Sequence, residues 1–217
     1  MATGTQIMYY GEKFNALTHL AGAVLALAGA VVLIVLAALD GDPRKVVSVS
    51  IYGVTLVLLY TFSTLYHSLR GRAKNVLREM DHQSIYLLIA GSYTPFCLVT
   101  LRGPWGWSLL VAIWSLALGG IFLRLKLRGR RHGLVVATYI AMGWLVVVAT
   151  QPMLAAVAPG GLALLAAGGI VYTAGVAFYK WKRLRYHHAI WHGFVMAGSA
   201  CHFFAVLFYV IPGPALA

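Results

Sequence analysis

Seven apolar runs, each about the length of a membrane-crossing helix, constrain this chain more than any other feature of its sequence. They occupy residues 17–39, 46–69, 82–101, 107–123, 133–150, 162–179 and 188–210. An α-helix rises ~1.5 Å per residue, so about 20 apolar residues cross a hydrocarbon core ~30 Å thick. The sequence therefore predicts an all-α integral membrane protein, folded as a bundle of seven transmembrane helices.

The overall composition supports the same class of protein. Hydrophobic residues make up 61% of the 217 residues and charged residues only 10%, which is more apolar surface than a soluble domain of this length can bury. The Asp40-Gly41-Asp42-Pro43 turn ends the first apolar run, because Gly and Pro continue a helix only at a cost. No internal repeat or linker separates the runs, so we interpret residues 1–217 as one domain.

The basic residues predict how the bundle is oriented in the membrane. Only Arg44, Lys45 and Arg102 fall on one side of the predicted bundle. The other fourteen Lys and Arg residues fall on the opposite side: Lys13, Arg70, Arg72, Lys74, Arg78, Arg124, Lys126, Arg128, Arg130, Arg131, Lys180, Lys182, Arg183 and Arg185. Such an excess marks the cytoplasmic side of a membrane protein. We therefore expect a cytoplasmic N-terminus, a C-terminus outside, and no nucleic-acid partner despite the net charge of +12.

Three histidines are predicted to meet near the cytoplasmic side. His188 and His192 are four residues apart and share one helix face at the start of the last run, whereas His67 lies at the end of the second run. Two imidazoles at this spacing, a third from another helix and a fourth position left for water form the pattern of a catalytic zinc site. The alternative is that they are interfacial histidines facing lipid headgroups.

Asp81 and Ser63 are candidate catalytic residues beside this cluster. Asp81 precedes the third run on the same side of the membrane, and Ser63 lies one helical turn before His67 on the same face. Asp81 either orients and deprotonates water or caps the start of its helix. Ser63 either donates a hydrogen bond to an oxyanion or bonds a carbonyl of its own helix. His202 lies ~15 Å beyond His192 along the last run and is not expected to belong to the site.

Four motifs occur in the order seen in hemolysin III-like proteins, the bacterial members of the progestin and adipoQ receptor family. They are Glu12-x-x-Asn15-x-x-x-His19, Ser63-x-x-x-His67, Asp81 followed by Tyr86-x-x-x-Ala90-Gly91-Ser92-Tyr93-Thr94-Pro95, and His188-x-x-x-His192. The chain resembles this family over nearly its whole length. The resemblance implies a multi-pass protein of the bacterial cell (inner) membrane, with zinc bound by His67, His188 and His192. It also implies kinship with membrane ceramidases, and hence lipid-amide hydrolysis.

Three functions follow as hypotheses. The leading one is a zinc-dependent hydrolase of an amide or ester bond in a membrane lipid, with an acyl chain or ceramide-like substrate lying among the helices. The second is a non-enzymatic membrane-homeostasis or receptor-like protein, in which structural zinc joins the second and seventh helices. The third is a hemolysin-type cytolytic pore, although His19, His202 and a few hydroxyls are sparse for lining one. The chain has no long terminal domain for a protein hormone, so no protein ligand is expected.

Overall fold

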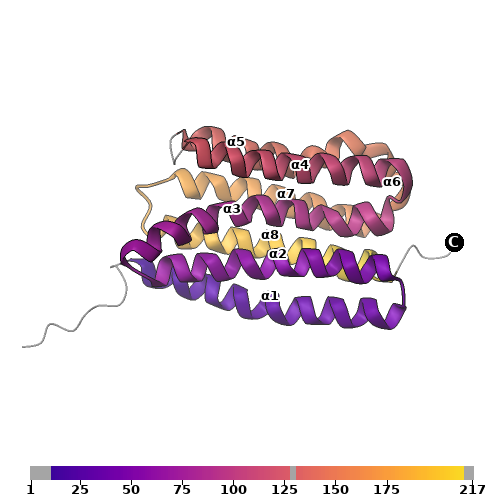
Figure 1. Cartoon of the computed structure of the whole chain (residues 1–217), viewed down its shortest axis with the longest axis horizontal. Coiled ribbons are helices and arrows are strands. Elements are labelled where there is room, and N and C mark those ends of the chain that lie inside the picture. Colours follow the sequence, from indigo (N-terminus) through magenta and orange to yellow (C-terminus); the bar gives the residue numbers. More distant parts are fainter. Residues whose placement is uncertain (1–10, 128–130, 213–217) are drawn as a thin grey trace, which may run out of the picture.

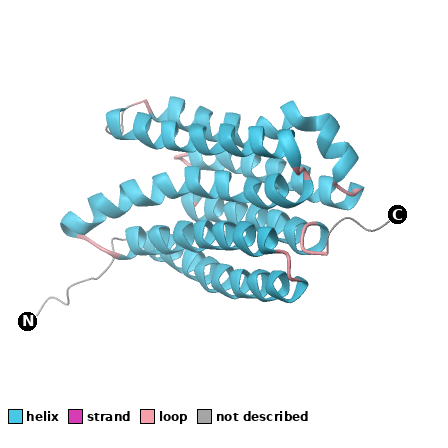
Figure 2. Cartoon of the chain, turned by 45° about the vertical axis from the view of Figure 1, so that its right-hand side comes forward, coloured by secondary structure: helices cyan, strands magenta, loops and turns pink. Residues whose placement is uncertain are grey.

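The computed structural model describes residues 11–127 and 131–212, and within these ranges every regular element is a helix (Figure 1). The elements are α1 (Glu12–Asp40), α2 (Pro43–Ser68), α3 (Gly71–Pro95), the π-helical turn η1 (Phe96–Thr100), α4 (Gly103–Leu127), α5 (His132–Gly143), the 3-10 segment η2 (Leu145–Ala149), α6 (Thr150–Ala156), α7 (Pro159–Lys180) and α8 (His187–Tyr209). Figure 2 shows these helices running side by side, joined by short loops. The prediction of an all-α fold is confirmed.

Six helical segments in the described ranges are long and apolar enough to cross a membrane. They are α1, α2, α4, residues Gly133–Ala156, α7 and α8. The helix predicted to form the third span, α3, is not among them. Its first half carries Arg72, Lys74 and Arg78, and these charges dilute its apolar character. The structure therefore supports a multi-pass helical bundle with six apolar spans.

Several helices begin earlier than their apolar runs, and at α1 and α3 the difference changes how the site is interpreted. α1 begins at Glu12 rather than near residue 17, so Glu12 lies on the same helix as His19. α3 begins at Gly71 rather than near residue 82, so Asp81 lies ten residues inside that helix. The suggestion that Asp81 caps the third helix is therefore wrong. Hydropathy marks only the apolar part of a helix, and both helices continue into polar sequence.

The fifth run was expected as one continuous helix, but the structure divides it. α5 ends at Gly143, and η2 and α6 continue the same crossing. The Tyr93 hydroxyl lies at this break, where it donates to the Met142 carbonyl (2.9 Å) and accepts from the Val146 amide (3.0 Å). Backbone groups released by the break are thereby satisfied, as an apolar environment requires.

Small residues let the helices that carry the site approach closely. α1 packs along α2 and also contacts α8, α2 packs on α3, and α7 packs on α8. A Cβ atom added at Gly22 of α1 would lie 2.6 Å from the Tyr60 ring of α2, and one added at Gly91 of α3 would lie 2.1 Å from Thr55 Oγ1. Close contacts of this kind drive helix association in lipid, where neighbouring apolar side chains gain little from leaving the bilayer.

The helices alternate in direction, so their ends gather at two opposite ends of the bundle (Figure 1). One end contains the start of α1, the end of α2 and the start of α8, together with the basic sequence around Lys74; we call it the basic end. The other contains the turn between α1 and α2 and the end of α8; we call it the distal end. At the distal end Asp42 caps α2 by accepting a hydrogen bond from the Arg44 amide (2.9 Å).

Candidate metal centre

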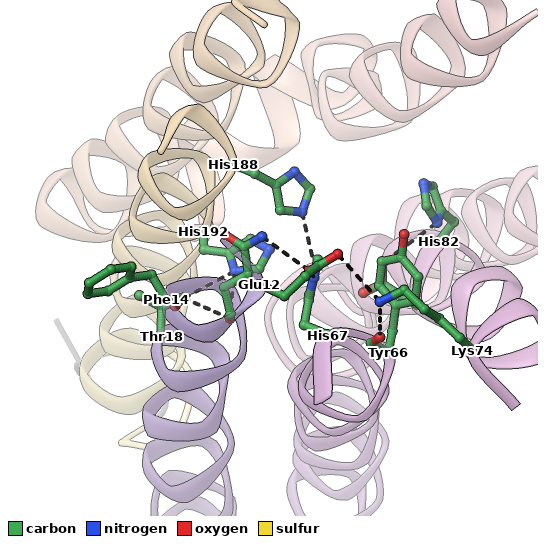
Figure 3. Close-up of polar contacts among 11 residues, drawn as sticks. Glu12, Phe14, Thr18, Tyr66, His67, Lys74, His82, His188 and His192 are labelled. Atoms are coloured by element: carbon green, nitrogen blue, oxygen red, sulfur yellow. Dashed lines mark hydrogen bonds and ion pairs between the residues drawn. The ribbon is translucent and has the colours of Figure 1, made fainter. Parts of the chain in front are cut away.

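Three histidines from α2 and α8 converge at the basic end of the bundle (Figure 3). The last turn of α2 supplies His67, and the first two turns of α8 supply His188 and His192. Each offers one nitrogen, and these three atoms lie within 4.8 Å of one another. His67 and His192 are buried, whereas His188 is partly exposed. The structure thus brings together the three residues that the sequence singled out as metal ligands.

One nitrogen–nitrogen distance in the cluster matches that between two ligands of a small divalent metal ion. His67 Nε2 lies 3.2 Å from His188 Nε2. Two nitrogens bound ~2.0–2.1 Å from a tetrahedral zinc lie about 3.3 Å apart. Neutral imidazole is a good zinc ligand, and three such ligands leave one coordination position open. The cluster can therefore hold a metal ion, with His67 and His188 already at ligand spacing.

The first turns of α1 contact two of these histidines from outside the cluster. The Glu12 carboxylate pairs with His67 Nδ1. His192 Nδ1 lies 3.1 Å from both the Asn15 carbonyl and Thr18 Oγ1. Glu12 and Asn15 belong to the first of the four sequence motifs, but their role could not be assigned from the sequence. Their spacing of three and four residues up to His19 was the available signal, because it places all three on one helix face.

His19 is buried beside the cluster without joining it. Its ring stacks on that of His192, with centroids 3.5 Å apart and planes 13° apart, and meets the Tyr60 ring edge-on at 5.0 Å. The side chain is 3% exposed, and neither ring nitrogen makes a hydrogen bond to a described residue. His19 therefore packs against a candidate ligand and retains unused hydrogen-bonding capacity.

Asp81 and Ser63 line an internal cavity next to the histidines. The cavity has a volume of about 170 Å³, and His188 and His192 also line it. Most of the other lining side chains are apolar or aromatic, among them Leu59, Ile85, Leu88, Trp144, Tyr172 and Trp191. The Ser63 hydroxyl faces the Asp81 carboxyl and makes no hydrogen bond of standard geometry to a described residue. The alternative that Ser63 only bonds a carbonyl of its own helix is therefore wrong.

A second hollow meets the first at the histidine cluster. Its volume is about 520 Å³, and Glu12, Asn15 and His67 are among the residues that line it. His188 lines both spaces. The cluster thus lies between an apolar cavity inside the bundle and a more polar hollow at the basic end.

Arg124 is a cavity residue that sequence reasoning placed in a basic loop. It lies in the last turn of α4, is 1% exposed, and its Nε is 3.1 Å from Glu79 Oε2 of α3. Its Nη1 makes no hydrogen bond to a described residue. Charge counting cannot distinguish such a buried cation from its solvated neighbours, because burial depends on how α3 and α4 pack.

Two other histidines of α8 lie outside the group of three, and one of them, His202, was not expected to belong to the site. His202 Nδ1 lies 2.9 Å from the Gly198 carbonyl of its own helix, and the ring lines the internal cavity. His187 is the first residue of α8. Neither belongs to the group of possible metal ligands found among the described residues.

The fold and the site together define a multi-pass helical membrane protein with three converging histidines beside an internal cavity. Residues 8–203 match the family described as haemolysin-III related. The chain is 48% identical to Hemolysin-3 of Bacillus cereus over 202 residues, covering 93% of this chain and 92% of that protein. It is 47% identical to the Hemolysin-3 homolog of Bacillus subtilis (strain 168) over 206 residues, covering 94% and 97%.

A human protein matches at lower identity. The monocyte to macrophage differentiation factor of Homo sapiens is 30% identical over 216 residues, covering 94% of this chain and 87% of that protein. The chain therefore belongs to the haemolysin-III related family and is a multi-pass bacterial membrane protein. The resemblance carried by the four sequence motifs is confirmed.

Proposed function

We propose that this protein is a zinc-dependent hydrolase that cleaves an amide or ester bond of a membrane lipid. One observation carries the proposal: two of the three clustered histidines and the Asp81 carboxyl line the same largely apolar cavity inside the bundle. A metal site that only joins helices needs neither a cavity nor a neighbouring carboxylate. Asp81 also has no capping role to explain its place, since it lies inside α3.

His67, His188 and His192 hold the metal in this proposal, with their neutral imidazoles as ligands. When bound, zinc supplies Lewis-acid chemistry that polarises a carbonyl group and makes water more acidic. The three histidines come from α2 and α8, so their geometry depends on packing between the second and the last helix. Three protein ligands would leave a zinc ion one position free for water or substrate.

Asp81 acts as the general base in the proposed reaction. Its carboxylate accepts a proton from the attacking water as the oxygen of that water bonds to the carbonyl carbon. The same proton then passes to the leaving nitrogen or oxygen as the amide or ester bond breaks, which yields a fatty acid and an amine or alcohol. Ser63 donates a hydrogen bond to the oxyanion that develops in between, and its hydroxyl is available because it bonds no carbonyl of its own helix.

The cavity selects the class of substrate. Its apolar and aromatic lining suits an acyl chain or a ceramide-like lipid. Leu59, Ile85 and Leu88 offer the chain no hydrogen bonds, whereas Ser63 and Asp81 line the same cavity as His188 and His192. A membrane lipid is therefore the proposed partner, and hydrolysis takes place where the bond to be cleaved lies beside Asp81 and these histidines.

The proposed topology has seven spans, with a cytoplasmic N-terminus and an external C-terminus. In support, α3 and η1 run between the two ends of the bundle beside α2 and α4, as a seventh crossing requires (Figure 1). The basic end carries most of the Lys and Arg residues, which favours the cytoplasmic side. A reporter fused after Ala217 is expected outside the membrane. A cytoplasmic reporter there would refute the span count or the orientation.

A non-enzymatic protein with a structural zinc is the second candidate. The observation in its favour is that the cluster bridges α2 and α8 through His67, and a metal ion could simply join these helices. The third candidate function, a cytolytic pore, is suggested by the name of the Bacillus cereus relative, Hemolysin-3. It is not favoured, because a pore needs a continuous polar lining and the cavity walls here are largely apolar.

Purified protein loaded with zinc and mixed with ceramides and phospholipids tests the proposal. Mass spectrometry is expected to detect released fatty acid with the wild-type protein. Chelator-treated wild-type protein and the His192→Ala variant serve as controls and are expected to release none. Full zinc loading without fatty-acid release from any ceramide or phospholipid would favour the structural role instead.

A further inference from the structure

The polar face of α1 makes hydrogen bonds whose direction can be deduced from chemistry alone. A backbone carbonyl only accepts, so the 3.1 Å contact between the Asn15 carbonyl and His192 Nδ1 requires the hydrogen to be on Nδ1. The Thr18 hydroxyl contributes its lone pair to the same nitrogen, because its own proton goes to the Phe14 or Asn15 carbonyl at 2.8 or 2.9 Å. In neutral His192 the free lone pair is therefore on Nε2.

The same argument applies to His67. A carboxylate only accepts, so the pairing of Glu12 with His67 Nδ1 places the hydrogen on Nδ1 and the lone pair on Nε2. His67 Nε2 is the nitrogen that lies 3.2 Å from His188 Nε2. The nitrogen that faces the cluster is thus the one able to bind a metal ion.

Glu12 is itself held in place by groups from two helices. Lys74 Nζ of α3 lies 3.4 Å from Glu12 Oε1, and Asn15 Nδ2 lies 3.4 Å from Glu12 Oε2. The Lys74 ammonium also donates to the Tyr66 carbonyl at 2.8 Å, next to His67 in the chain (Figure 3). Lys74 thus contacts the Glu12 carboxylate through Oε1, and Oε2 is the oxygen that contacts His67. Lys74 near the start of α3 and Asn15 in α1 thus position the Glu12 carboxylate, and this carboxylate contacts His67 Nδ1.

We propose that Glu12 is a positioning residue of the metal centre: its carboxylate fixes the tautomer and orientation in which His67 presents Nε2 to His188 and His192. The inference rests on the proposed zinc site and extends it to a residue that does not touch the metal. A carboxylate behind a ligand histidine also raises the basicity of the imidazole, and loss of such a partner typically lowers metal affinity about 10–100-fold.

Two substitutions at Glu12 separate this role from a purely structural one. Glu12→Met keeps the length of the side chain and removes every acceptor, whereas Glu12→Gln keeps an acceptor oxygen and removes the charge. The zinc dissociation constant of the detergent-purified full chain is expected to rise about 10–100-fold in Glu12→Met and by a smaller factor in Glu12→Gln. Glu79→Gln is the matched control, since that carboxylate also lies at the basic end but pairs with Arg124. Its zinc affinity is expected to equal that of the wild type.

The visible spectrum of the cobalt(II)-loaded protein provides the second measurement. Glu12→Met is expected to change the position or intensity of its ligand-field bands, and Glu12→Gln to restore them toward the wild type. If wild type, Glu12→Met and Glu12→Gln bind zinc equally and give one cobalt spectrum, Glu12 is not a positioning residue, although the zinc site stands. If both variants only lower the melting temperature of the metal-free protein, its role is structural. A wild-type protein that binds no zinc overturns the metal site and this inference together.

Discussion

The two ends of the bundle bury polar groups in opposite ways. At the distal end Lys45 is 5% exposed, and its ammonium contacts Asp40 Oδ1 at 2.7 Å and donates to the Ile211 carbonyl at 2.6 Å. At the basic end His19, Ser63 and Arg124 are each at most 3% exposed. Each of these three has a side-chain nitrogen or oxygen without a hydrogen bond of standard geometry to a described residue.

Under the proposed function, the satisfied Lys45 cluster at the distal end is structural, whereas the unsatisfied groups at the basic end belong to a site that takes a ligand. A buried polar group left without a partner costs about 1–3 kcal/mol, so a fold that only needed stability would satisfy it or replace it. Lys45 follows that rule and connects α1, α2 and the segment after α8. His19, Ser63 and Arg124 all line the internal cavity, where water and substrate would supply the missing partners in the proposed reaction.

Removal of one clustered histidine is expected to have the largest effect. His192→Ala should lower bound zinc from about one ion per chain to nearly none, because two remaining imidazoles hold zinc poorly. Elemental analysis of purified protein measures the zinc content. His67→Ala and His188→Ala should behave alike, whereas His202→Ala and His187→Ala should keep the ion. Equal zinc in His192→Ala and His202→Ala would show that these three histidines are not the ligands.

Replacement of Asp81 is expected to abolish most turnover without loss of zinc. Asn has nearly the same shape as Asp but cannot accept the proton from water, and general bases contribute about 10²–10⁴-fold. Fatty-acid release by Asp81→Asn should fall by this factor while its zinc content stays at the wild-type level. Asp42→Asn makes the same chemical change at the distal end, where Asn caps α2 about as well as Asp, and should leave turnover unchanged. Near-normal turnover in Asp81→Asn would rule out a general-base role.

A substitution at the distal end is expected to change stability alone. Lys45→Met leaves the Ile211 carbonyl and the Asp40 carboxylate without their shared donor, at a cost of about 1–3 kcal/mol in the free energy of unfolding. Denaturation followed by circular dichroism measures this loss. The zinc dissociation constant should stay at the wild-type value, because Lys45 lies at the opposite end from the histidines. A parallel loss of zinc affinity would show that the two ends are coupled.

Ser63→Ala at the basic end should have a smaller effect on stability than Lys45→Met at the distal end. The hydroxyl makes no hydrogen bond of standard geometry in the described structure, so its removal should change the free energy of unfolding by no more than ~0.5 kcal/mol. Fatty-acid release should nevertheless fall, since an oxyanion donor is lost. Unfolding measurements that show a loss as large as that in Lys45→Met would identify Ser63 as a structural residue.

The convergence of the three histidines could be predicted because it depends on two regular features. Helical periodicity places His188 and His192 on one face, and the charge asymmetry places His67 at the same end of the bundle. Both features can be deduced from the sequence before any helix is packed. The order and approximate positions of the helices follow from hydropathy for the same reason.

The residues that support the cluster could not be predicted in this way. Glu12 precedes the apolar run, and its helical state depends on packing of α1 against α2 and α8. Asp81 was placed at a helix start because the polar residues from Gly71 onward conceal the first half of α3. The burial of Arg124 depends on its pairing with Glu79. The contacts of Glu12 and Arg124 are long-range and the start of α3 lies in polar sequence, so the pattern of apolar residues reveals none of the three.

The contact between α1 and α8 joins the first and last helices of the bundle, where His19 stacks on His192. A ribosome delivers Glu12 and His67 to the membrane long before it reaches His188. The early helices therefore insert with Glu12 and His67 before His188 and His192 are synthesised. A chain that stops before α8 contains one of the three candidate ligands, so it would lack the proposed metal site.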